Sequence, residues 1–235
     1  FITVPALGVL DNDFDPDTGE TATLLVVGAD LVSAMGADVF VNPDGSFDYD
    51  PSVSDQLNAL AFGESADDTF TYTIEDINGE IDTATVTVTV AGVNDEPDAN
   101  ETFNTTNEDQ FLSVLPIGVL VNDTDPDTSD MPIVSSFDAT SAEGATVVVT
   151  PDGGFTYDPT AATNLHAIPL NSSAFDSFGY EIDDGNGGTS TSFAFIDVIG
   201  VNDAPVADDD TGAIDEDTVL NVAANGVLAN DSDID

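Results

Sequence analysis

The 235-residue sequence contains no lysine and no arginine, although it carries 47 aspartate and glutamate residues. The formal net charge is −47, and the only cations in the chain are His166, when protonated, and the terminal amine. The protein therefore cannot neutralise its carboxylates with its own basic side chains. Closely spaced carboxylates without such partners bind metal ions, and hard oxygen ligands favour calcium over softer ions.

Three further absences exclude some kinds of stabilisation and some classes of partner. Without cysteine the chain forms neither disulfides nor thiolate zinc sites, and without lysine it cannot form Lys–Asn crosslinks. No apolar run approaches the roughly 18 residues that a membrane span requires. An acidic surface repels nucleic acid and anionic lipid headgroups, which are bound through lysine and arginine. We therefore expect no nucleic-acid partner and no direct membrane insertion, and metal is the expected stabiliser.

The residues that are present indicate an all-β fold. Hydrophobic residues make up 41% of the chain, with 14 phenylalanines, which is too many for a disordered acidic tail. Residues 83–90 alternate threonine with Ala84 and three valines, as in a half-buried antiparallel strand. The Pro-Asp-Gly triplet at Pro43 separates the strand-like runs 38–41 and 46–49 and predicts a hairpin turn. No segment has a convincing amphipathic helical pattern.

The chain is built from repeats. The segment that begins Gly8-Val9-Leu10 recurs at Gly118 and again at Gly226, at offsets of 110 and 108 residues. A unit of this length is the size of a β-sandwich. The predicted domains are repeat 1 (1–94, without its first strand), repeat 2 (95–202) and the incomplete beginning of repeat 3 (203–235). We expect the chain to be part of a longer tandem array.

The repeat motifs resemble a known family. Gly63-Glu64-Ser65, the strand that starts at Asp68, the threonine–valine run and Asn94-Asp95-Glu96-Pro97 closely resemble the VCBS repeats of large bacterial surface proteins. The Asn-Asp-x-Asp-x-Asp runs fit the same bacterial cadherin-like group. The resemblance covers essentially the whole chain. It implies tandem Ig- or cadherin-like antiparallel β-sandwich domains arranged head to tail, in proteins secreted to the bacterial cell surface.

The resemblance also implies where the carboxylates meet, because it brings the loops of consecutive repeats together at a junction. Calcium takes six to eight oxygen ligands, and loops with acids at alternate positions can supply them. We therefore predict several Ca²⁺ ions at interdomain junctions. The candidate ligands of the first junction are Glu64, Asp67, Asp68, Asn94, Asp95, Asn122, Asp123, Asp125, Asp127, Asp183 and Asp184. Those of the second junction are Glu108, Asp109, Asp176, Asn202, Asp203, Asp231 and Asp233.

The acidic runs have other interpretations. They could be solvated turns, since Asp and Asn favour turns. An EF-hand is not expected, because the flanking helices and the glutamate at the twelfth loop position are lacking. His166, the sole imidazole, lies in an irregular stretch and is expected to be a surface loop residue rather than a ligand.

The function predicted from these features is a calcium-stiffened extender of a bacterial adhesin, whose partners are the neighbouring repeats of the same chain. The alternative is a subunit of an extracellular filament or sheath built from the same calcium-binding repeats. An enzyme is not expected, because the acids lie in turn loops without an aromatic-lined groove. Neither a Ser-His-Asp arrangement nor a glycine-rich phosphate loop is found.

Two phenylalanines point to a contact with like chains. Phe193 and Phe195 stand where repeat 1 has Thr85 and Thr87. The alternate positions of this strand, which are predicted to face the core, remain apolar as Ala194 and Ile196. Both rings should therefore face outward, and two adjacent aromatics on a strand tend to mark a partner surface. The alternatives are a covering loop or a shift of register by one residue, which would bury the rings.

Overall fold

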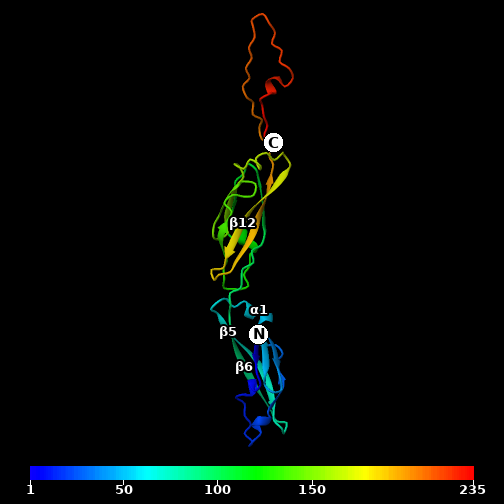
Figure 1. Cartoon of the computed structure of the whole chain (residues 1–235), viewed down its shortest axis with the longest axis vertical. Coiled ribbons are helices and arrows are strands. Elements are labelled where there is room, and N and C mark those ends of the chain that lie inside the picture. Colours follow the sequence, from blue (N-terminus) through cyan, green and yellow to red (C-terminus); the bar gives the residue numbers. More distant parts are fainter. The chain divides into compact units, whose positions relative to one another are not determined.

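The computed structural model describes residues 1–235, which form two compact units (Figure 1). Unit 1 comprises Phe1–Pro97 together with Thr124–Pro132 and Asp184–Gly188. Unit 2 comprises Asp98–Asp123, Ile133–Asp183 and Thr189–Asp235. Two loops of sequence repeat 2 are thus part of the compact unit that repeat 1 forms.

Unit 1 contains two three-stranded sheets. One has the order β1-β4-β3, formed by Ile2–Val4, Phe47–Asp50 and Asp38–Val41, and the other has the order β2-β5-β6, formed by Leu25–Ala29, Ser65–Glu75 and Ile81–Ala91. The only α-helix of the chain is α1 (Asp55–Asn58), and 3-10 turns lie at Gly8–Leu10, Thr21–Thr23 and Pro51–Val53. With four residues, α1 is far too short to cross a membrane, and no other helix of the chain is long and apolar enough.

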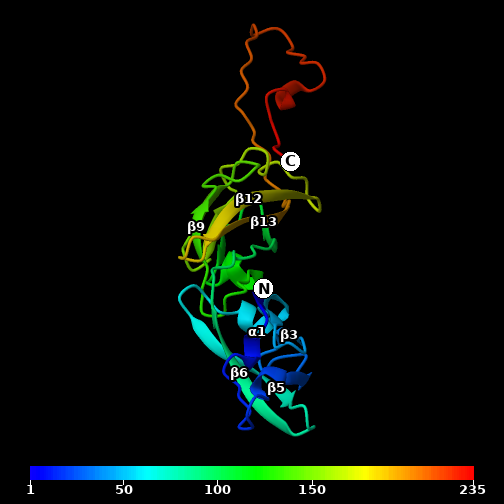
Figure 2. The same ribbon diagram turned by 60° about the horizontal axis from the view of Figure 1, so that its bottom comes forward.

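Unit 2 repeats this plan with one additional strand. Its smaller sheet has the order β10-β11-β8, formed by Thr146–Val149, Phe155–Asp158 and Leu112–Val114. The larger sheet has the order β7-β13-β12-β9, formed by Thr102–Asn107, Thr189–Ile199, Ser173–Asp183 and Ile133–Phe137; Figure 2 shows β9, β12 and β13 as neighbours. Gly118–Asn122 and Gly226–Leu228 form 3-10 turns.

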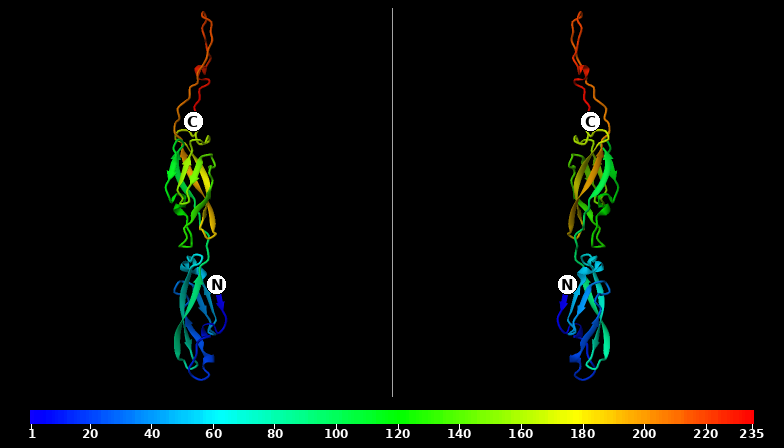
Figure 3. Two further views of the ribbon diagram at one scale, coloured as in Figure 1. Left: turned by 90° about the vertical axis from the view of Figure 1, so that its left-hand side faces the viewer. Right: turned by 90° about the vertical axis from the view of Figure 1, so that its right-hand side faces the viewer.

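Strand β7 distinguishes the two units. It pairs in parallel with β13, from Thr102 opposite Ala194 to Asn107 opposite Ile199 (Figure 3). Unit 1 has no strand in the corresponding place, so one edge of β6 is unpaired. The inward residues of β13, such as Ile196, are completely buried, whereas those of β6, such as Val88, are only partly buried.

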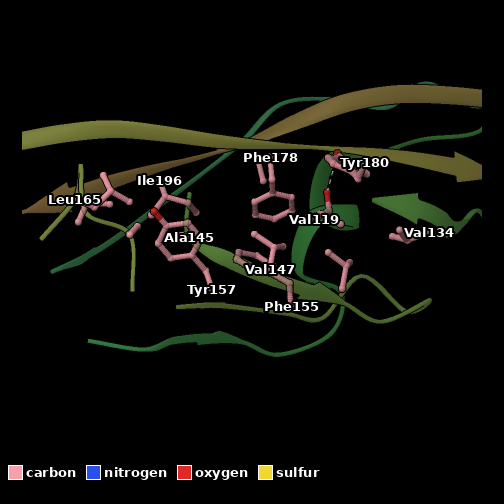
Figure 4. Close-up of a cluster of buried hydrophobic side chains, with 14 of the residues drawn as sticks. Val119, Val134, Ala145, Val147, Phe155, Tyr157, Leu165, Phe178, Tyr180 and Ile196 are labelled. Atoms are coloured by element: carbon pink, nitrogen blue, oxygen red, sulfur yellow. Dashed lines mark hydrogen bonds between the residues drawn. The ribbon is translucent and has the colours of Figure 1, made fainter. Parts of the chain in front are cut away.

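The cores of the two units are built alike. The rings of Phe155 and Phe178 meet edge to face at 5.3 Å, and those of Phe47 and Phe70 do so at 5.4 Å, both at an interplanar angle of 65°. In Figure 4, Phe178 lies above Val147 and Phe155, and the hydroxyl of Tyr180 donates a hydrogen bond to the backbone carbonyl oxygen of Val119. The prediction of an all-β fold of tandem antiparallel sandwiches is confirmed.

The predicted hairpin turn between β3 and β4 is present. Gly45 has φ 80°, and a Cβ atom there would lie 2.4 Å from the carbonyl oxygen of Leu7. Only glycine fits both the left-handed backbone and this close approach. The side chain of Asp44 closes the turn by accepting the N–H of Ser46 at 3.1 Å.

The predicted register of the last strand is also correct. Phe193 is 51% exposed and Phe195 lies on the same outer face, while Ala194 and Ile196 are fully buried. Residues 203–235 contribute no buried side chain and contain only the 3-10 turn at Gly226–Leu228 and an isolated bridge between Val206 and Ser232.

Candidate metal centre

The acid cluster of unit 1 is formed by Asp125, Asp130 and Asp184, whose carboxylate oxygens lie within 4.8 Å of one another. Asp125 and Asp130 come from the loop that follows the 3-10 turn at Gly118–Asn122, and Asp184 begins the loop between β12 and β13. No lysine or arginine exists to balance these three charges.

The loop between β12 and β13 is folded around the carboxylate of Asp184. Oδ1 accepts backbone N–H groups from Asn186 at 2.7 Å, Gly187 at 2.9 Å and Gly188 at 3.0 Å. Oδ2 accepts the side-chain amide of Asn94 at 2.8 Å. A Cβ atom on Gly188 would lie 2.2 Å from Asp184 Oδ2, so this packing requires glycine.

The second loop is held by the chain segment that contains Asn94 and Asp95. Asp127 is completely buried, and its Oδ2 accepts the backbone N–H of Asp95 at 2.8 Å. The N–H of Asp127 in turn donates to Asp125 Oδ1 at 2.9 Å. The amide of Asn186 donates to Asp130 Oδ2 at 2.8 Å, which ties the two loops together.

Three oxygens around this cluster are buried and have no hydrogen-bond partner. They are Asn94 Oδ1, Asp125 Oδ2 and Asp127 Oδ1. A buried polar atom left without a partner costs about 1–3 kcal/mol, and a charged one costs more. A bound cation would stabilise an arrangement in which several such oxygens gather.

The charges of the cluster affect its pKa values. Desolvation, followed by the negative charges of Asp127, Asp130 and Asp184, raises the pKa of Asp125. Desolvation also acts to raise the pKa of Asp184, but the amide of Asn94 and the backbone N–H groups outweigh it, and the net pKa is lowered. Asp184 is thus held as an anion, whereas ionised Asp125 lacks a compensating positive charge.

The donor set fits calcium. Every side-chain ligand atom in the cluster is an oxygen of a carboxylate or an amide, and such hard ligands suit calcium or magnesium. Asn94, Asp125, Asp127, Asp130 and Asp184 could hold the ion between them. Ligands from separate loops favour calcium, because magnesium demands a stricter octahedral geometry.

The same loop of repeat 1 forms a related but more open cluster. Asp15, Asp17 and Glu20 have carboxylate oxygens within 4.8 Å of one another, and the amide of Asn78 donates to Glu20 Oε2 at 2.7 Å. Desolvation and the charges of Asp15, Asp17 and Asp76 raise the pKa of Glu20. Asp17 is exposed, whereas its counterpart Asp127 is completely buried.

Asp68 and Asp176 require a correction, because both are core residues rather than members of a cluster. The Asp68 carboxylate accepts hydrogen bonds from the hydroxyls of Ser33 and Tyr49 and from the N–H of Met35. The Asp176 carboxylate likewise accepts hydrogen bonds from the hydroxyls of Ser141 and Tyr157 and from the backbone N–H of Glu143. These carboxylates are fully used as acceptors inside the sandwich.

Other predicted ligands of the first junction also have structural partners. Asn122 donates its amide to the carbonyl of Glu101 at 2.9 Å, and Asp123 accepts the N–H of Asn100 at 2.6 Å and the hydroxyl of Tyr180 at 3.2 Å. Asp67 accepts the hydroxyl of Thr89 on the outer face of β5. Elsewhere, exposed Glu64 accepts the N–H of Ala61, and Asp183 ends β12 on the outer face.

The predicted ligands of the second junction are only partly brought together. Glu108 and Asp203 belong to one cluster with His166, and Asp109 Oδ1 lies 3.7 Å from His166 Nδ1. Asn202 donates its amide to the carbonyl of Asp203 at 2.5 Å. In residues 203–235, Asp231 accepts the N–H of Asp208 and Asp233 is exposed beside Asp235.

Five cluster residues were not among the predicted ligands, namely Asp15, Asp17, Glu20, Asp130 and His166. Asp130 lies six residues beyond Thr124, outside the alternating run that identified Asp125 and Asp127, and only its place at the end of the same loop could have indicated it. His166 is separated from Glu108 by 58 residues, and no local motif links them.

The fold and these clusters define a tandem β-sandwich protein with acidic loop sites. A family model described as bacterial cadherin-like domain matches residues 2–92 and again 94–200, which together make up most of the chain. The chain belongs to the bacterial cadherin-like domain family. No curated protein matches it in sequence.

Solved structures that are similar to this chain include a cadherin and two protocadherins. Mouse cadherin-23 EC22-24 is 16% identical with a TM-score of 0.43, covering 80% of this chain and 56% of that one. Human mucin-like protocadherin EC1-2 is 12% identical with a TM-score of 0.42, covering 76% and 84%. The protocadherin gamma B7 extracellular cadherin domains 1-4 are 15% identical with a TM-score of 0.44, covering 89% and 50%. This chain thus spans about half the length of two of these three structures.

Proposed function

We propose that the protein is an extracellular extender of a bacterial surface adhesin, in which calcium stiffens the connection between successive sandwich domains. Its role is architectural rather than enzymatic, and its immediate partners are the neighbouring repeats of its own chain. The observation that carries the proposal is the gathering of Asn94, Asp125 and Asp127 oxygens, buried and without donors, beside Asp130 and Asp184.

The contacts of Asn94 and Asp95 give the proposed stiffening a physical basis. The first family match ends at residue 92 and the second begins at residue 94, so Asn94 and Asp95 lie at the boundary between the repeats, and they bond to Asp184 and Asp127 of repeat 2. A calcium ion bound to oxygens of both segments would hold the connecting segment in one conformation. Without the ion, the like charges of Asp125, Asp127, Asp130 and Asp184 repel one another, and the segment should move freely.

Calcium titration of the chain after treatment with EDTA tests the proposal. Extracellular modules bind calcium at about 10⁻⁴–10⁻³ M, so millimolar calcium should suffice. We expect the melting temperature to rise by about 5–10 °C at saturation. In small-angle scattering we expect calcium to narrow the distribution of the radius of gyration, because the connecting segment is held in one conformation. If neither quantity responds to calcium, the proposal is wrong.

A matched pair of variants assigns the site. Asp127→Asn removes a buried oxygen charge, whereas Asp17→Asn makes the same change at the exposed position of repeat 1. We expect Asp127→Asn to weaken calcium binding by about tenfold or more, equivalent to ~1.4 kcal/mol, and Asp17→Asn to have a smaller effect. Equal effects would place the ion elsewhere.

A second candidate function, a subunit of an extracellular filament or sheath, is supported by one surface. The outer aromatic face of unit 2 consists of Phe103, Phe175, Phe193 and Phe195. The rings of Phe103 and Phe195 stack at 5.3 Å, and those of Phe193 and Phe195 lie 6.3 Å apart. Phe103 and Phe175 are 70% and 71% exposed. Exposed aromatic groups of this kind tend to mark a contact with a partner.

A further inference from the structure

The larger sheet of unit 2 has a shallow cavity on its outer side, beside one ring of the outer aromatic face. The cavity has a volume of about 260 Å³, and its lining includes Asp138, Gly179, Glu181 and Phe193. Pockets for small-molecule ligands usually measure about 300–1,000 Å³, so this cavity is sized for a single side chain. The proposed extender function makes no use of it.

The floor of the cavity is Gly179, which replaces a threonine of repeat 1. Gly179 pairs with Phe193 across β12 and β13. At the matching positions of unit 1, Thr71 pairs with Thr85. A Cβ atom on Gly179 would lie 2.9 Å from Asp138 Oδ2 and 3.5 Å from Phe193 Cε1. The missing side chain therefore opens the space between the carboxylate and the ring.

The same replacement removes a hydrogen-bond donor from a carboxylate. In unit 1, Asp30 Oδ2 accepts both the backbone N–H and the hydroxyl of Thr71, each at 2.7 Å. Its counterpart Asp138 accepts the backbone N–H of Gly179 at 2.9 Å, and glycine has no hydroxyl to add. The N–H of Asp138 donates to the carbonyl of Gly179 at 2.9 Å, which holds the acid in place. Asp138 is thus a positioned carboxylate with acceptor capacity left.

A second carboxylate on this face has lost its donor in a related way. In unit 1, the hydroxyl of Thr89 donates to Asp67 Oδ1 at 2.6 Å. In unit 2 the matching pair is Asp197 and Phe175, which lie opposite each other on β13 and β12. The acid thus faces a phenyl ring that donates no hydrogen bond. Asp197 Oδ1 is buried and has no hydrogen-bond partner. An ionised oxygen in this state is costly unless a cation reaches it.

Acids beside exposed rings form a surface that recognises an organic cation. Phe193 borders the cavity with Asp138, and half-buried Glu181 adds a second carboxylate to its lining. A cation is attracted to the face of an aromatic ring. A guanidinium group also stacks on such rings, binds carboxylates through two hydrogen bonds and is more weakly hydrated than an ammonium group. The chain contains no arginine, so the cation must come from another molecule, and a second copy of the chain cannot supply it.

We propose that the outer face of unit 2 binds arginine side chains of a basic partner protein. One guanidinium enters the cavity between Asp138 and Phe193, and a second reaches Asp197 beside Phe175. Phe193 and Asp197 lie four positions apart on β13, a distance of about 13 Å at ~3.3 Å per residue. An extended segment covers the same distance in four residues. The partner that fits therefore presents arginines at positions i and i+4 of an extended segment.

Calorimetric titration of the full chain with a Gly-Ser peptide that carries two arginines at this spacing tests the proposal. Saturating calcium and about 0.15 M salt reduce non-specific attraction to the other acids. Gly179→Thr restores the residue of repeat 1 without changing the charge, and we expect it to weaken binding by about fivefold, as should Phe193→Thr. Its melting temperature should stay unchanged, because Thr71 occupies the same place in unit 1.

A matched pair of charge variants completes the experiment. Asp138→Asn and Asp30→Asn remove one charge each from equivalent positions of the two units. We expect Asp138→Asn to weaken peptide binding by about fivefold or more, and Asp197→Asn to do the same. Asp30→Asn should change the affinity by less than about twofold, because exposed charges elsewhere are screened.

Three results would overturn the inference. Affinities of Gly179→Thr and Phe193→Thr within about twofold of the parent chain would mean that net charge alone attracts the peptide. Equal binding of a peptide with lysines in place of the arginines would remove the guanidinium from the site. No binding, together with self-association through the same face, would leave the filament alternative. Salt separates these cases, since it weakens arginine binding but favours contact between chains of charge −47. Because calcium is saturating throughout, none of these results decides the extender proposal.

Discussion

The hydroxyl of Tyr49 donates a 2.7 Å hydrogen bond to the buried carboxylate of Asp68. Tyr157 makes the same 2.7 Å bond to Asp176 in unit 2. Desolvation acts to raise the pKa of Asp68, but the hydroxyls of Ser33 and Tyr49 and the backbone N–H groups outweigh it, and its pKa lies below the ordinary value. The ionised aspartate is therefore the form that the core is built to hold.

Asp68→Asn should destabilise unit 1 without affecting calcium binding. The amide nitrogen cannot accept the hydroxyl bonds that the carboxylate accepts, and buried donors are left unpaired. We expect a loss of about 2–4 kcal/mol in the free energy of unfolding, measured by urea denaturation. Asp17→Asn, which makes the same change of charge at an exposed position, is the control. An unchanged unfolding midpoint for Asp68→Asn would contradict this assignment.

The same carboxylate predicts a dependence of stability on pH. Because the folded pKa of Asp68 lies below its ordinary value of 3.8, ionised Asp68 stabilises the fold above that value. The contribution is lost as pH falls through the folded pKa. The stability difference between the parent chain and Asp68→Asn should hence be constant from pH 7 to about pH 5 and shrink below about pH 4. Urea melts in calcium-free buffer measure it, and a difference that grows on acidification would refute the role.

Gly188→Ala should weaken calcium binding without any change of charge. The added Cβ would lie 2.2 Å from Asp184 Oδ2 and 3.1 Å from Asn94 Nδ2, so at least one of these side chains must move. Gly28→Ala in β2 is the matched control, because its Cβ would meet only Thr73 at 3.9 Å. Calcium titration by calorimetry should give a weaker site for Gly188→Ala alone. If the two variants bind equally, Asp184 is not a ligand.

The two predicted junctions should respond differently to mutation. Asp125→Ala removes an unpaired buried oxygen of the complete cluster, whereas Asp231 lies in residues 203–235, which contain no buried side chain. We expect Asp125→Ala to weaken calcium binding more than Asp231→Ala in parallel titrations. Asp123→Ala should mainly lower stability, because Asp123 accepts the hydroxyl of Tyr180. If Asp231→Ala lowers the calcium affinity more than Asp125→Ala does, the prediction that the first junction binds calcium more tightly is wrong.

Replacing Phe193 and Phe195 by threonine tests the filament alternative. These are the residues that repeat 1 has at the same positions, Thr85 and Thr87, so the strand should tolerate them. The double variant should keep its thermal unfolding profile and lose lateral association, which light scattering measures. Because each copy carries a net charge of −47, association of the parent chain should need calcium or high salt. Normal association of the double variant would remove the support for a filament.

Much of the fold could be predicted from local pattern. The alternation in β13 gave the correct outward direction of Phe193, and the Pro-Asp-Gly triplet located the turn between β3 and β4. The period of about 108 residues indicated repeated sandwiches, as the two sets of sheets show. These features succeed because strand alternation and turn chemistry depend on residues that are close in sequence.

The site was less predictable, because its ligands are distributed over distant segments. Asp68 was counted with the loop acids although it alternates in phase with Phe70 and Tyr72, which places it on the inner face of β5. Strand phase could have identified it. The contact of His166 with Glu108 and Asp203 depends instead on how loops far apart in sequence pack, and no short-range pattern encodes that packing.

The parallel pairing of β7 with β13 has a mechanical consequence. β7 is the first strand of unit 2 and β13 is the last, and two parallel strands begin at the same end of a sheet. Tension along the polypeptide therefore pulls these strands in opposite directions past each other. Six residue pairs, from Thr102 with Ala194 to Asn107 with Ile199, would bear this shear together rather than open one after another. Such a domain should resist stretching under flow far better than its equilibrium stability alone implies.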